Sequence, residues 1–372
     1  MSKVRLGDVV ILQPKSKIKA GEGLSKGKYK FFTSSNVQSK WSMDYQYDKP
    51  ALIFGTGGMP SVHYCETPFS TSTDCIVMYG NEDINLELIY QYLSANIQIL
   101  KEGFHGAGLQ HISKIYLLDL MIPEIAPEIE KKIVNVANKI DGLIALRKQQ
   151  LSKLDELVKA RFVELFGDPS NNPNSFNVVT FNDCVEYMGD IGSNGANKVV
   201  VEHLDMKDEE DYALMVRFLN FTKNDFTDDV KYVSKEAYDF FKKSQIFGGE
   251  LIICKIGSAG QNYVMPYLNR PVSLGLNQIM VRINEKTIMP YLYQYLNTDY
   301  GKQLIAGCIN GAVTKSITKT ELKKIPVIVP PMELQNQFAA FVEQTEKSKL
   351  AIQKSLDELE VLKKALMQEY FG

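Results

Sequence analysis

Two long stretches of the chain repeat apolar residues at alternating steps of three and four. The first runs from Pro127 to Phe166, is followed by Gly167, and has its apolar positions at Ile133, Ala137, Ile140, Ile144, Leu151, Leu154, Val158 and Leu165. This period of about 3.5 residues is typical of a helix whose apolar seam faces another helix. Only Arg147 interrupts the stripe. At about 1.5 Å per residue the helix would be roughly 60 Å long, so it needs a partner helix rather than a compact core.

The second stretch supplies that partner. It runs from Pro331 to Phe371 and carries the same spacing at Phe338, Val342, Thr345, Ile352, Leu356, Leu359 and Leu366. Both stretches contain Leu-Asp-Glu-Leu and both end in Phe-Gly. A proline suits the first helical turn, and a glycine suits the residue that follows a helix. We therefore predict two long helices that pair antiparallel within one chain; two unrelated core helices are the alternative.

The rest of the chain also repeats. LIYQYLSA (88–95) matches YLYQYLNT (291–298), and GAGLQHISKIYLLDL (106–120) matches GAVTKSITKTELKKI (311–325). Before both of these matches, IFGTGGMPSV aligns with CKIGSAGQNYV if Gly55 is paired with Gly257 and Gly58 with Gly260. Matches in the same order at a nearly constant offset indicate a tandem duplication. The second half carries extra residues before its glycine loop, and we expect much of that surplus in the acidic stretch from Glu202 to Asp211.

Short runs of β-branched and aromatic residues predict strands within each globular half. The clearest are Tyr29–Phe32, Ala51–Phe54, Cys75–Met78, Leu251–Cys254 and Gln278–Ile283, while Ile84–Asn96 and Met289–Asn297 resemble short helices. The fold class is therefore α+β, with two tandem-repeat globular domains separated by two long antiparallel helices that form an intramolecular coiled coil with pseudo-twofold symmetry. The predicted boundaries are a first globular domain at 1–124, the first long helix at 125–167, a polar linker at 168–177, a second globular domain at 178–328 and the second long helix at 329–372.

Composition narrows the class of protein. Apolar residues make up 45% and charged residues 23% of the 372, which is ordinary for a globular protein. No apolar run approaches the roughly 20 residues of a membrane span, and the N-terminus lacks a signal-peptide core, so we expect a cytoplasmic protein that makes no membrane contact. The five scattered cysteines are expected to be reduced and mostly buried, and four histidines without metal-ligand spacing predict no metal site.

The net charge of −2 does not indicate a nucleic-acid partner by itself, but its distribution is uneven. Residues 1–50 hold ten Lys or Arg against four Asp or Glu, and residues 300–325 hold five against one. Residues 201–230 hold three basic against nine acidic residues. Two basic regions and one acidic region are compatible with a protein that contacts phosphates in two places. Random clustering on a solvated surface is the alternative.

No enzyme motif is complete. The chain has no GxxxxGK[ST] phosphate loop, no nucleophile elbow and no Asn-Pro-Pro-aromatic tetrapeptide, and the glycine run that starts at Gly55 ends in Pro60 instead of opening a GxGxxG helix. We therefore predict no catalytic residues and no cofactor.

The paired glycine loops are the remaining candidate sites. Glycines let a backbone approach a ligand closely and offer N–H groups to phosphates. The matched segments around His111 and Ser316 carry different side chains on one framework, as readout of two different DNA half-sites would require; tight turns without a ligand are the alternative. The predicted DNA-binding residues are Lys15, Lys17, Lys19, Lys26, Lys28, Ser35, Thr56, Gly57, Gly58, Gln110, His111, Lys255, Ser258, Gly260, Gln261, Thr314, Lys315, Ser316 and Lys319.

The chain resembles the specificity subunits of type I restriction-modification systems. The resemblance rests on LDELVKARFVELFGDP (154–169) after a long helix, on the segments PALIFGTGG and GGELIICKIGSAG, and on the proline-led helix starts PEIAPEIEKKIV and IPVIVPPMELQNQF. It covers nearly the whole chain. One departure is the glutamine-containing entry to the long helix, which is clear at Glu333–Gln337 but blurred at Glu128–Lys132.

The resemblance implies a non-catalytic subunit that binds double-stranded DNA. Each globular half would be a target recognition domain for one half of a bipartite, asymmetric site. The paired helices would set the spacer between the half-sites and dock two methyltransferase subunits, with two restriction and translocase subunits added to the complex. Cofactors such as S-adenosylmethionine and ATP would belong to those partners. Two hypotheses compete with this one: a coiled-coil scaffold with two paralogous binding heads and no DNA, and a stand-alone DNA-modifying enzyme.

Overall fold

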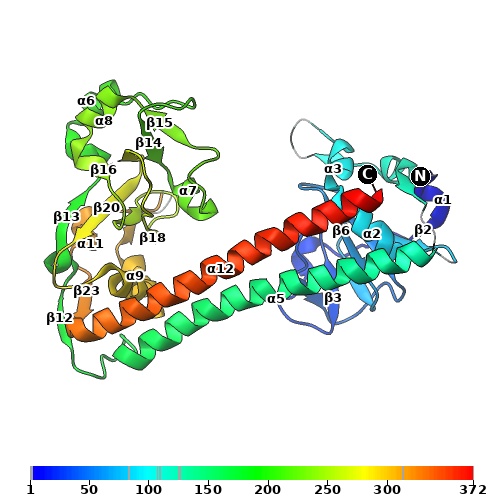
Figure 1. The fold of residues 1–372 in the computed structure, drawn as a ribbon, viewed down its shortest axis with the longest axis horizontal. Coiled ribbons are helices and arrows are strands. Elements are labelled where there is room, and N and C mark those ends of the chain that lie inside the picture. Colours follow the sequence, from blue (N-terminus) through cyan, green and yellow to red (C-terminus); the bar gives the residue numbers. More distant parts are fainter. Residues whose placement is uncertain are drawn as a thin grey trace. The chain divides into compact units, whose positions relative to one another are not determined.

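The computed structural model (Figure 1) describes residues 3–82, 84–106, 108, 110–124, 127–311 and 314–371. The chain forms two compact units, the first made of residues 1–150 with 351–372 and the second of residues 151–350. Both units mix helices and strands, which confirms the α+β class. Some predicted features fall on residues outside the described ranges, namely the first two positions of the helix predicted from residue 125, the terminal glycine, and Ala107, Leu109, Ala312 and Val313 in the matched loops.

The first unit is built on a four-stranded antiparallel sheet with the order β2-β8-β5-β6 and a three-stranded sheet with the order β4-β3-β7. In the smaller sheet β3 and β7 run parallel. The strands of the first unit are β1 (Lys3–Arg5), β2 (Val10–Leu12), β3 (Tyr29–Phe32), β4 (Lys40–Ser42), β5 (Ala51–Gly55), β6 (Ser61–Cys65), β7 (Phe69–Thr71), β8 (Cys75–Gly80), β9 (Phe104–His105), β10 (His111–Ile112) and β11 (Met121–Pro123). Its short helices are α1 (Leu6–Val9), α2 (Leu86–Ala95), α3 (Ile97–Glu102) and α4 (Lys114–Asp119).

Strand β5 lies between two layers, which explains its unbroken apolar sequence. All five of its residues are buried, and because side chains alternate along a strand they enter two different cores. Leu52 and Phe54 belong to a cluster with Leu93 of α2. Ile53 belongs to a second cluster with Phe69 of the smaller sheet. The strand therefore cannot shift by one residue without exchanging these two cores, and its C-terminal end is held in a fixed position.

The second unit repeats this plan. Its sheets have the orders β13-β20-β17-β18, antiparallel throughout, and β15-β14-β19-β16, in which β14 and β19 run parallel. The strands are β12 (Asn177–Thr180), β13 (Val185–Gly189), β14 (Ala213–Val216), β15 (Lys231–Val233), β16 (Gln245–Ile246), β17 (Leu251–Cys254), β18 (Asn262–Val264), β19 (Val272–Leu274), β20 (Gln278–Ile283), β21 (Ile309–Asn310), β22 (Ser316–Ile317) and β23 (Pro326–Val329). The helices are α6 (Asn197–His203), α7 (Phe218–Lys223), α8 (Lys235–Phe240), α9 (Met289–Asn297), α10 (Asp299–Gly307) and α11 (Lys319–Leu322).

The two units share strand order, parallel pair and edge hairpins, as a duplication predicts. In each, the first and last strands pair antiparallel, β1 with β11 and β12 with β23. The expected position of the extra residues was wrong. Between β14 and β17 the second unit carries α7, β15, α8 and β16, where the first unit has only β4 between β3 and β5. Most of the surplus therefore follows β14, because it supplies the additional edge strand β16 and the helices α7 and α8 rather than an acidic loop.

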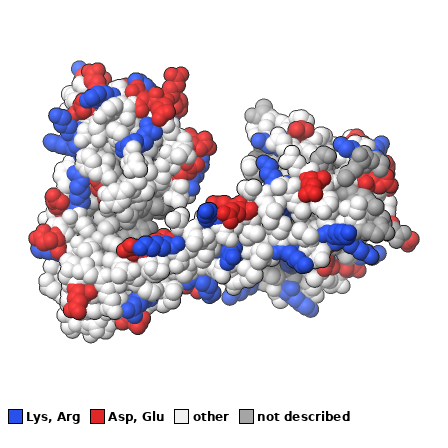
Figure 2. Space-filling model, viewed as in Figure 1, with Lys and Arg blue, Asp and Glu red and all other residues white. Residues whose placement is uncertain are grey.

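The acidic stretch is paired rather than free. Lys207 contacts both Asp205 and Asp211, while Asp208 pairs with Lys231 and Glu210 with Arg270. Figure 2 shows the same alternation of basic and acidic side chains over the part of the second unit that carries α6 and α8. This part of the surface therefore holds few uncompensated carboxylates.

The predicted long helices are α5 (Pro127–Phe166) and α12 (Met332–Phe371), each of 40 residues. Gly167 adopts a φ of 75°, and its N–H donates to the carbonyl of Val163 at 2.8 Å, which ends α5 as its sequence predicts. Of the predicted stripe on α5, Ile133, Ala137, Ile140 and Val158 are buried, and Ile144, Leu151, Leu154 and Leu165 are half-buried. On α12, Phe338, Thr345 and Leu356 are buried, and Val342, Ile352, Leu359 and Leu366 are half-buried.

Segments of the two helices run antiparallel within each unit. In the first unit Asp141 pairs with Lys363 at 2.6 Å and Lys148 with Glu360 at 3.6 Å, so residue numbers rise on one helix as they fall on the other. In the second unit the same holds for Asp155 with Lys349 at 2.6 Å and for Phe162 against Phe338 at 5.5 Å between ring centroids.

The apolar stripe predicted from the sequence left out two buried residues in the last turns of α5. Phe162 is fully buried, Phe166 is nearly so, and both pack against Tyr291 of α9. At this end α5 packs into the core of the second unit as well as against α12. Its buried positions therefore follow steps of four, and a 3.5-residue period selects Leu165 instead.

One polar residue joins α12 to the second unit. Gln335 is 0% exposed. Its Oε1 accepts hydrogen bonds from Thr287 Oγ1 at 3.0 Å and from the Ile288 N–H at 3.1 Å. Its Nε2 donates to the carbonyls of Lys286 at 3.3 Å and Pro330 at 2.9 Å. A single glutamine therefore fixes the start of α12 against the segment that leads into α9.

The first unit has glutamate at the matching place. Glu130 lies one turn into α5 beside Asn85, the residue that caps α2. Burial raises the pKa of the Glu130 carboxyl, and a hydrogen bond with Asn85 partly offsets that rise. The blurred helix entry seen in the sequence is thus a replacement of glutamine by an acid at one structural position.

Candidate nucleic-acid interface

The loop that follows β5 is fixed by hydrogen bonds to two other segments. Thr56 donates through its N–H at 2.9 Å and through its hydroxyl at 3.0 Å to the carbonyl of Asp74. The Gly57 N–H donates to Ser34 Oγ at 3.4 Å. Gly58 has a φ of 82° and no neighbour within 4 Å of an added Cβ, so only its backbone conformation requires glycine. The predicted residues Thr56, Gly57 and Gly58 therefore form a rigid, accessible turn.

Gln110 and His111 lie against this turn. The Gln110 carbonyl accepts from the Gly58 N–H at 3.3 Å, and His111 forms a β-bridge with Gly57. The Thr56 carbonyl lies 3.1 Å from His111 Nδ1 and accepts from the Ile112 N–H at the same distance. Two segments far apart in the sequence thus form one surface. Ser35 is next in the chain to Ser34, whose hydroxyl donates to the Asp74 carbonyl at 2.8 Å and so belongs to this surface. Ser34 was not among the residues predicted from the sequence.

The basic residues near the N-terminus divide into two groups. Ser16 is buried and donates to the Thr71 carbonyl at 2.6 Å, and Lys15 and Lys17 on either side of it are exposed. Of these two lysines, Lys15 lines the same cavity as Thr56 of the turn. Lys19 follows, and its backbone N–H donates to Glu22 at 2.7 Å. Lys26 and Lys28 lie beside β3 and β4, and within the described ranges no hydrogen bond or ion pair joins them to the turn at Thr56.

A cavity of about 580 Å³ opens beside the turn in the first unit. Its floor contains Cys75, Val77 and Ile112, which are buried. The cationic or ionisable side chains that line it are Lys15, His111 and Lys114. Burial raises the pKa of the Cys75 thiol to about 11, so the floor stays uncharged near neutral pH. Lys114 was not predicted, although it aligns with Lys319 in the repeated segment.

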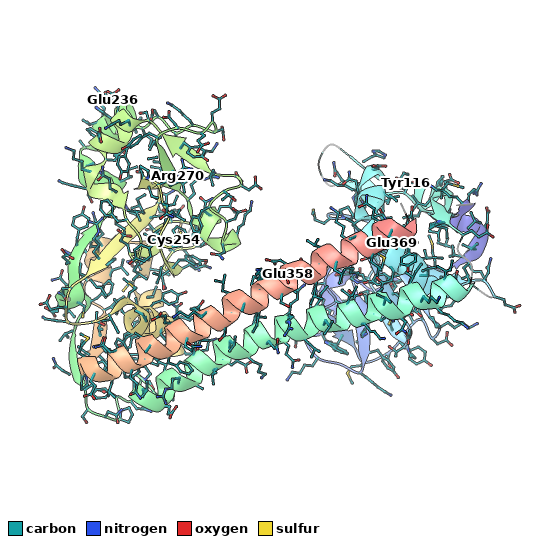
Figure 3. All side chains as sticks on the ribbon, in the orientation of Figure 1. Tyr116, Glu236, Cys254, Arg270, Glu358 and Glu369 are labelled. Atoms are coloured by element: carbon teal, nitrogen blue, oxygen red, sulfur yellow. The ribbon has the colours of Figure 1, made fainter. Side chains whose placement is uncertain are left out.

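The loop that follows β17 occupies the same place in the second unit. The Lys255 N–H donates to the Asn277 carbonyl at 2.7 Å, and its own carbonyl accepts from the Ile317 N–H at 3.0 Å. Ile256 forms a β-bridge with Ser316, which brings the predicted Thr314–Ser316 segment alongside. The loop closes on itself where the Gly260 N–H donates to the carbonyl of Cys254 at 2.9 Å. Figure 3 labels Cys254, the last residue of β17.

The remaining predicted residues of this loop lie at its far side. The Gln261 N–H donates to the Ser258 carbonyl at 3.1 Å, and Gln261 is exposed. Gly260 has a φ of 86°, and an added Cβ would lie 2.4 Å from Ile305 Cγ2, so the position excludes any side chain. Gly260 is thus required by packing under the loop, whereas the Lys255 carbonyl is bound by the Ile317 N–H next to Ser316.

The register of the sheets corrects the sequence alignment of the two loops. Gly55 is paired with Cys75, and the matching pair in the second unit is Cys254 with Gln278. Thr56 therefore corresponds to Lys255, and Gly58 corresponds to Gly257, which also has a positive φ of 87°. The pairing of Gly55 with Gly257 and of Gly58 with Gly260 was wrong, because the second loop is longer and repeats the glycine spacing further along.

A buried carboxylate organises the lysines of the second unit. Asp190, 7% exposed, lies 2.8 Å from Lys255 Nζ and 2.9 Å from Lys319 Nζ. Ser193 completes the group by donating to Asp190 at 3.0 Å and accepting from Lys319 at 2.9 Å. Burial alone would raise the pKa of Asp190, but the hydrogen bonds and charges of the two lysines hold it at about 2. Sequence analysis missed Asp190 and Ser193 because neither is near either lysine along the chain.

Other chemistry is limited within the described part of the chain. Across those residues no group of three or more His, Cys, Asp or Glu side chains is arranged to hold a metal ion. All five cysteines are buried and none forms a disulfide, as predicted for reduced thiols. No helix in the same ranges is long and apolar enough to cross a membrane.

Comparison with known proteins identifies the family. A family model described as the type I restriction modification DNA specificity domain matches residues 1–156 and 188–362. A protein of Methanocaldococcus jannaschii named as a type I restriction enzyme MjaX specificity subunit is 27% identical over 158 residues, which are 41% of this chain. The match spans 36%, about a third, of that relative's length.

Solved structures agree in fold. The crystal structure of a type I restriction-modification system S subunit from M. genitalium superposes with a TM-score of 0.58 at 16% identity, covering 100% of this chain and 96% of that one. A structure reported for the complex assembly and conformational transition of the type I restriction-modification system gives 0.51 at 15% identity, covering 99% and 96%. Since the family model matches more than half of the chain in two copies, the chain belongs to the family of type I restriction-modification specificity subunits.

Proposed function

We propose that this chain is the DNA-reading, non-catalytic subunit of a type I restriction-modification complex. Each globular domain, 1–124 and 178–328, would recognise one half of a bipartite, asymmetric site in double-stranded DNA. The observation that carries the proposal is the repeated surface beside β5 and β17. In both units a turn with a positive-φ glycine lies against a second segment, yet the side chains differ, with Thr56 and His111 in one and Lys255 and Ser316 in the other.

Such a pair of surfaces suits recognition of two different sequences. A conserved framework fixes the distance from backbone to DNA, and differing hydrogen-bonding side chains select the bases. The residues proposed to face DNA in the first unit are Lys15, Lys17, Ser35, Thr56, Gly57, Gly58, Gln110 and His111, joined here by Lys114. Those in the second are Lys255, Ser258, Gln261, Thr314, Lys315, Ser316 and Lys319.

The long helices are proposed to form one intramolecular coiled coil that relates the domains by a pseudo-twofold axis and sets the spacer between the half-sites. Antiparallel ion pairs on both halves of α5 and α12 support this, since Asp141 with Lys363 and Asp155 with Lys349 keep one register. We further propose that the helices dock two methyltransferase subunits and that two restriction and translocase subunits complete the complex. S-adenosylmethionine and ATP would be bound by those partners.

Salt dependence of DNA binding tests the proposal against a scaffold that binds no DNA. The full chain, with its methyltransferase partners, is titrated with a fluorescent duplex of mixed sequence at several salt concentrations. DNA recognition predicts an affinity that falls steeply and linearly on a log–log plot as phosphate-bound counterions are released. A flat or undetectable response would favour the scaffold, and methyl transfer by the chain without partners would favour a stand-alone enzyme.

A further inference from the structure

The position of Asp190 has a counterpart in the first unit that can be found from hydrogen bonds. Gly189 pairs with Met280 in the sheet, and the Gln13 N–H donates at 2.9 Å to Val77, the residue equivalent to Met280. The next residue after each, Pro14 and Asp190, therefore occupies one structural position. The first unit has no carboxylate there.

The lysine that Asp190 holds is present in both units. The Ile112 N–H donates to the carbonyl of the residue that follows β5, and the Ile317 N–H donates to the carbonyl of the residue that follows β17. Ile112 and Ile317 therefore correspond, and so do Lys114 and Lys319, which lie two residues further along the chain. Both are the first residues of a short helix, α4 and α11, and both follow a side-chain cap, Ser113 and Thr318. The same lysine thus contacts an internal acid in the second unit and lines an open cavity in the first.

We propose that the cavity beside Lys114 binds one phosphate group of the DNA backbone, and that Asp190 takes the place of that phosphate in the second unit. This inference rests on the proposed DNA-reading function and assigns the two domains unequal electrostatic roles. In the first unit Lys15, His111 and Lys114 surround about 580 Å³ of open space over an uncharged floor. In the second unit the same space holds a carboxylate with two lysines and a serine hydroxyl at 2.8 to 3.0 Å, the contacts that a bound phosphate oxygen would make.

The arrangement has a functional consequence. Lys255 and Lys319 share one carboxylate, so the three side chains carry a net charge of +1, and we expect the two lysines together to contribute about one contact, not two, to the salt dependence of affinity. Lys255 and Lys319 are oriented by Asp190 and can offer fixed N–H donors to base edges, whereas Lys114 is available as an uncompensated charge for the backbone. Asp190 is therefore a positioning residue, and the cavity is a phosphate site.

The test compares Lys114→Ala with wild type in the full chain, using a mixed-sequence duplex between 50 and 200 mM salt. One phosphate contact contributes about 0.9 to the slope of log affinity against log salt. Raising the salt fourfold should therefore weaken DNA binding by Lys114→Ala by a factor that is about three times smaller than the factor for wild type. Lys114→Arg should restore the slope, and Lys101→Ala, which removes an exposed lysine of the same unit outside the cavity, serves as control.

Asp190→Asn gives an independent arm. Freed from their acid, Lys255 and Lys319 should increase the slope by about one contact. A wild-type slope for Lys114→Ala, or an unchanged slope for Asp190→Asn, would overturn the inference while leaving the proposed function intact. Absence of salt-dependent binding by wild type would overturn both. Inorganic phosphate that binds wild type but not Lys114→Ala, with no change in the DNA slope, would mean a free-phosphate site and would also refute the assignment.

Discussion

Truncation of Gln335 should weaken the second unit far more than loss of an average helix residue. Gln335→Ala removes four hydrogen bonds from a side chain that is 0% exposed. Two of the partner residues, Thr287 and Pro330, are themselves buried. The Thr287 hydroxyl would lose its acceptor, and the Pro330 carbonyl would lose its donor. An unsatisfied buried group costs about 1–3 kcal/mol, so these two alone predict a loss of about 2–6 kcal/mol, with about 4 kcal/mol as the central value.

Denaturant unfolding measures this loss. With an m-value of about 2 kcal/mol/M in urea, a loss of 4 kcal/mol lowers the midpoint by about 2 M. The single tryptophan, Trp41, belongs to the first unit, so its fluorescence follows that unit while far-UV circular dichroism follows both. We expect the dichroism transition of the variant to separate into two steps, with the tryptophan signal in the later step.

A matched control lies on the same helix. Gln337 is exposed, and Gln337→Ala should change stability by no more than about 0.5 kcal/mol. If Gln335→Ala destabilised the protein by less than about 1 kcal/mol, or no more than Gln337→Ala, the glutamine would not join α12 to the domain as the hydrogen bonds imply.

Three further predictions concern single features of the structure. The pKa of Glu130 is raised by burial, so its charged form opposes folding; stability should fall as pH rises through that pKa, and Glu130→Gln should be more stable than wild type at pH 7 but not at pH 4 in thermal unfolding. Burial raises the pKa values of Cys75 and Cys184 to about 11, so a thiol reagent at pH 8 should label neither until the protein unfolds, and rapid labelling of the native protein would contradict their burial. Insertion of one heptad into each long helix should lengthen the spacer of the recognised DNA site, whereas an unchanged spacer would exclude the ruler role.

Local signals along the chain were enough to predict the long helices. A proline at the start and a glycine at the end mark α5, and its period is strong over 40 residues. On α5 the period failed at Phe162 and Phe166, where the helix packs against the strands and helices of a domain as well as a second helix. The strands were equally clear where both faces of the strand are buried, as in β5 and β17. An unbroken run of apolar residues is stable in a strand only if both of its faces are covered by other parts of the protein.

The candidate site was only half predictable. The turns at Thr56 and Lys255 and their neighbours at His111 and Ser316 could be found because the duplication marks matched loops. The residue-by-residue correspondence of the two turns could not be predicted from the sequence. The two loops differ in length, and each has its glycines where its own backbone conformation requires them. The link between Lys319 and Asp190 spans 129 positions and exists only because two sheets bring β13 and α11 together, so no local pattern records it.

Exchange of one domain tests the central claim most directly. Residues 1–124 are replaced by the corresponding domain of another family member, the complete restriction-modification system is expressed in a host, and the methylated positions are mapped by sequencing its DNA. Modular recognition predicts that one half of the recognised sequence changes while the other half and the spacer stay the same. A change in both halves, or in neither, would contradict the assignment of one half-site to each domain.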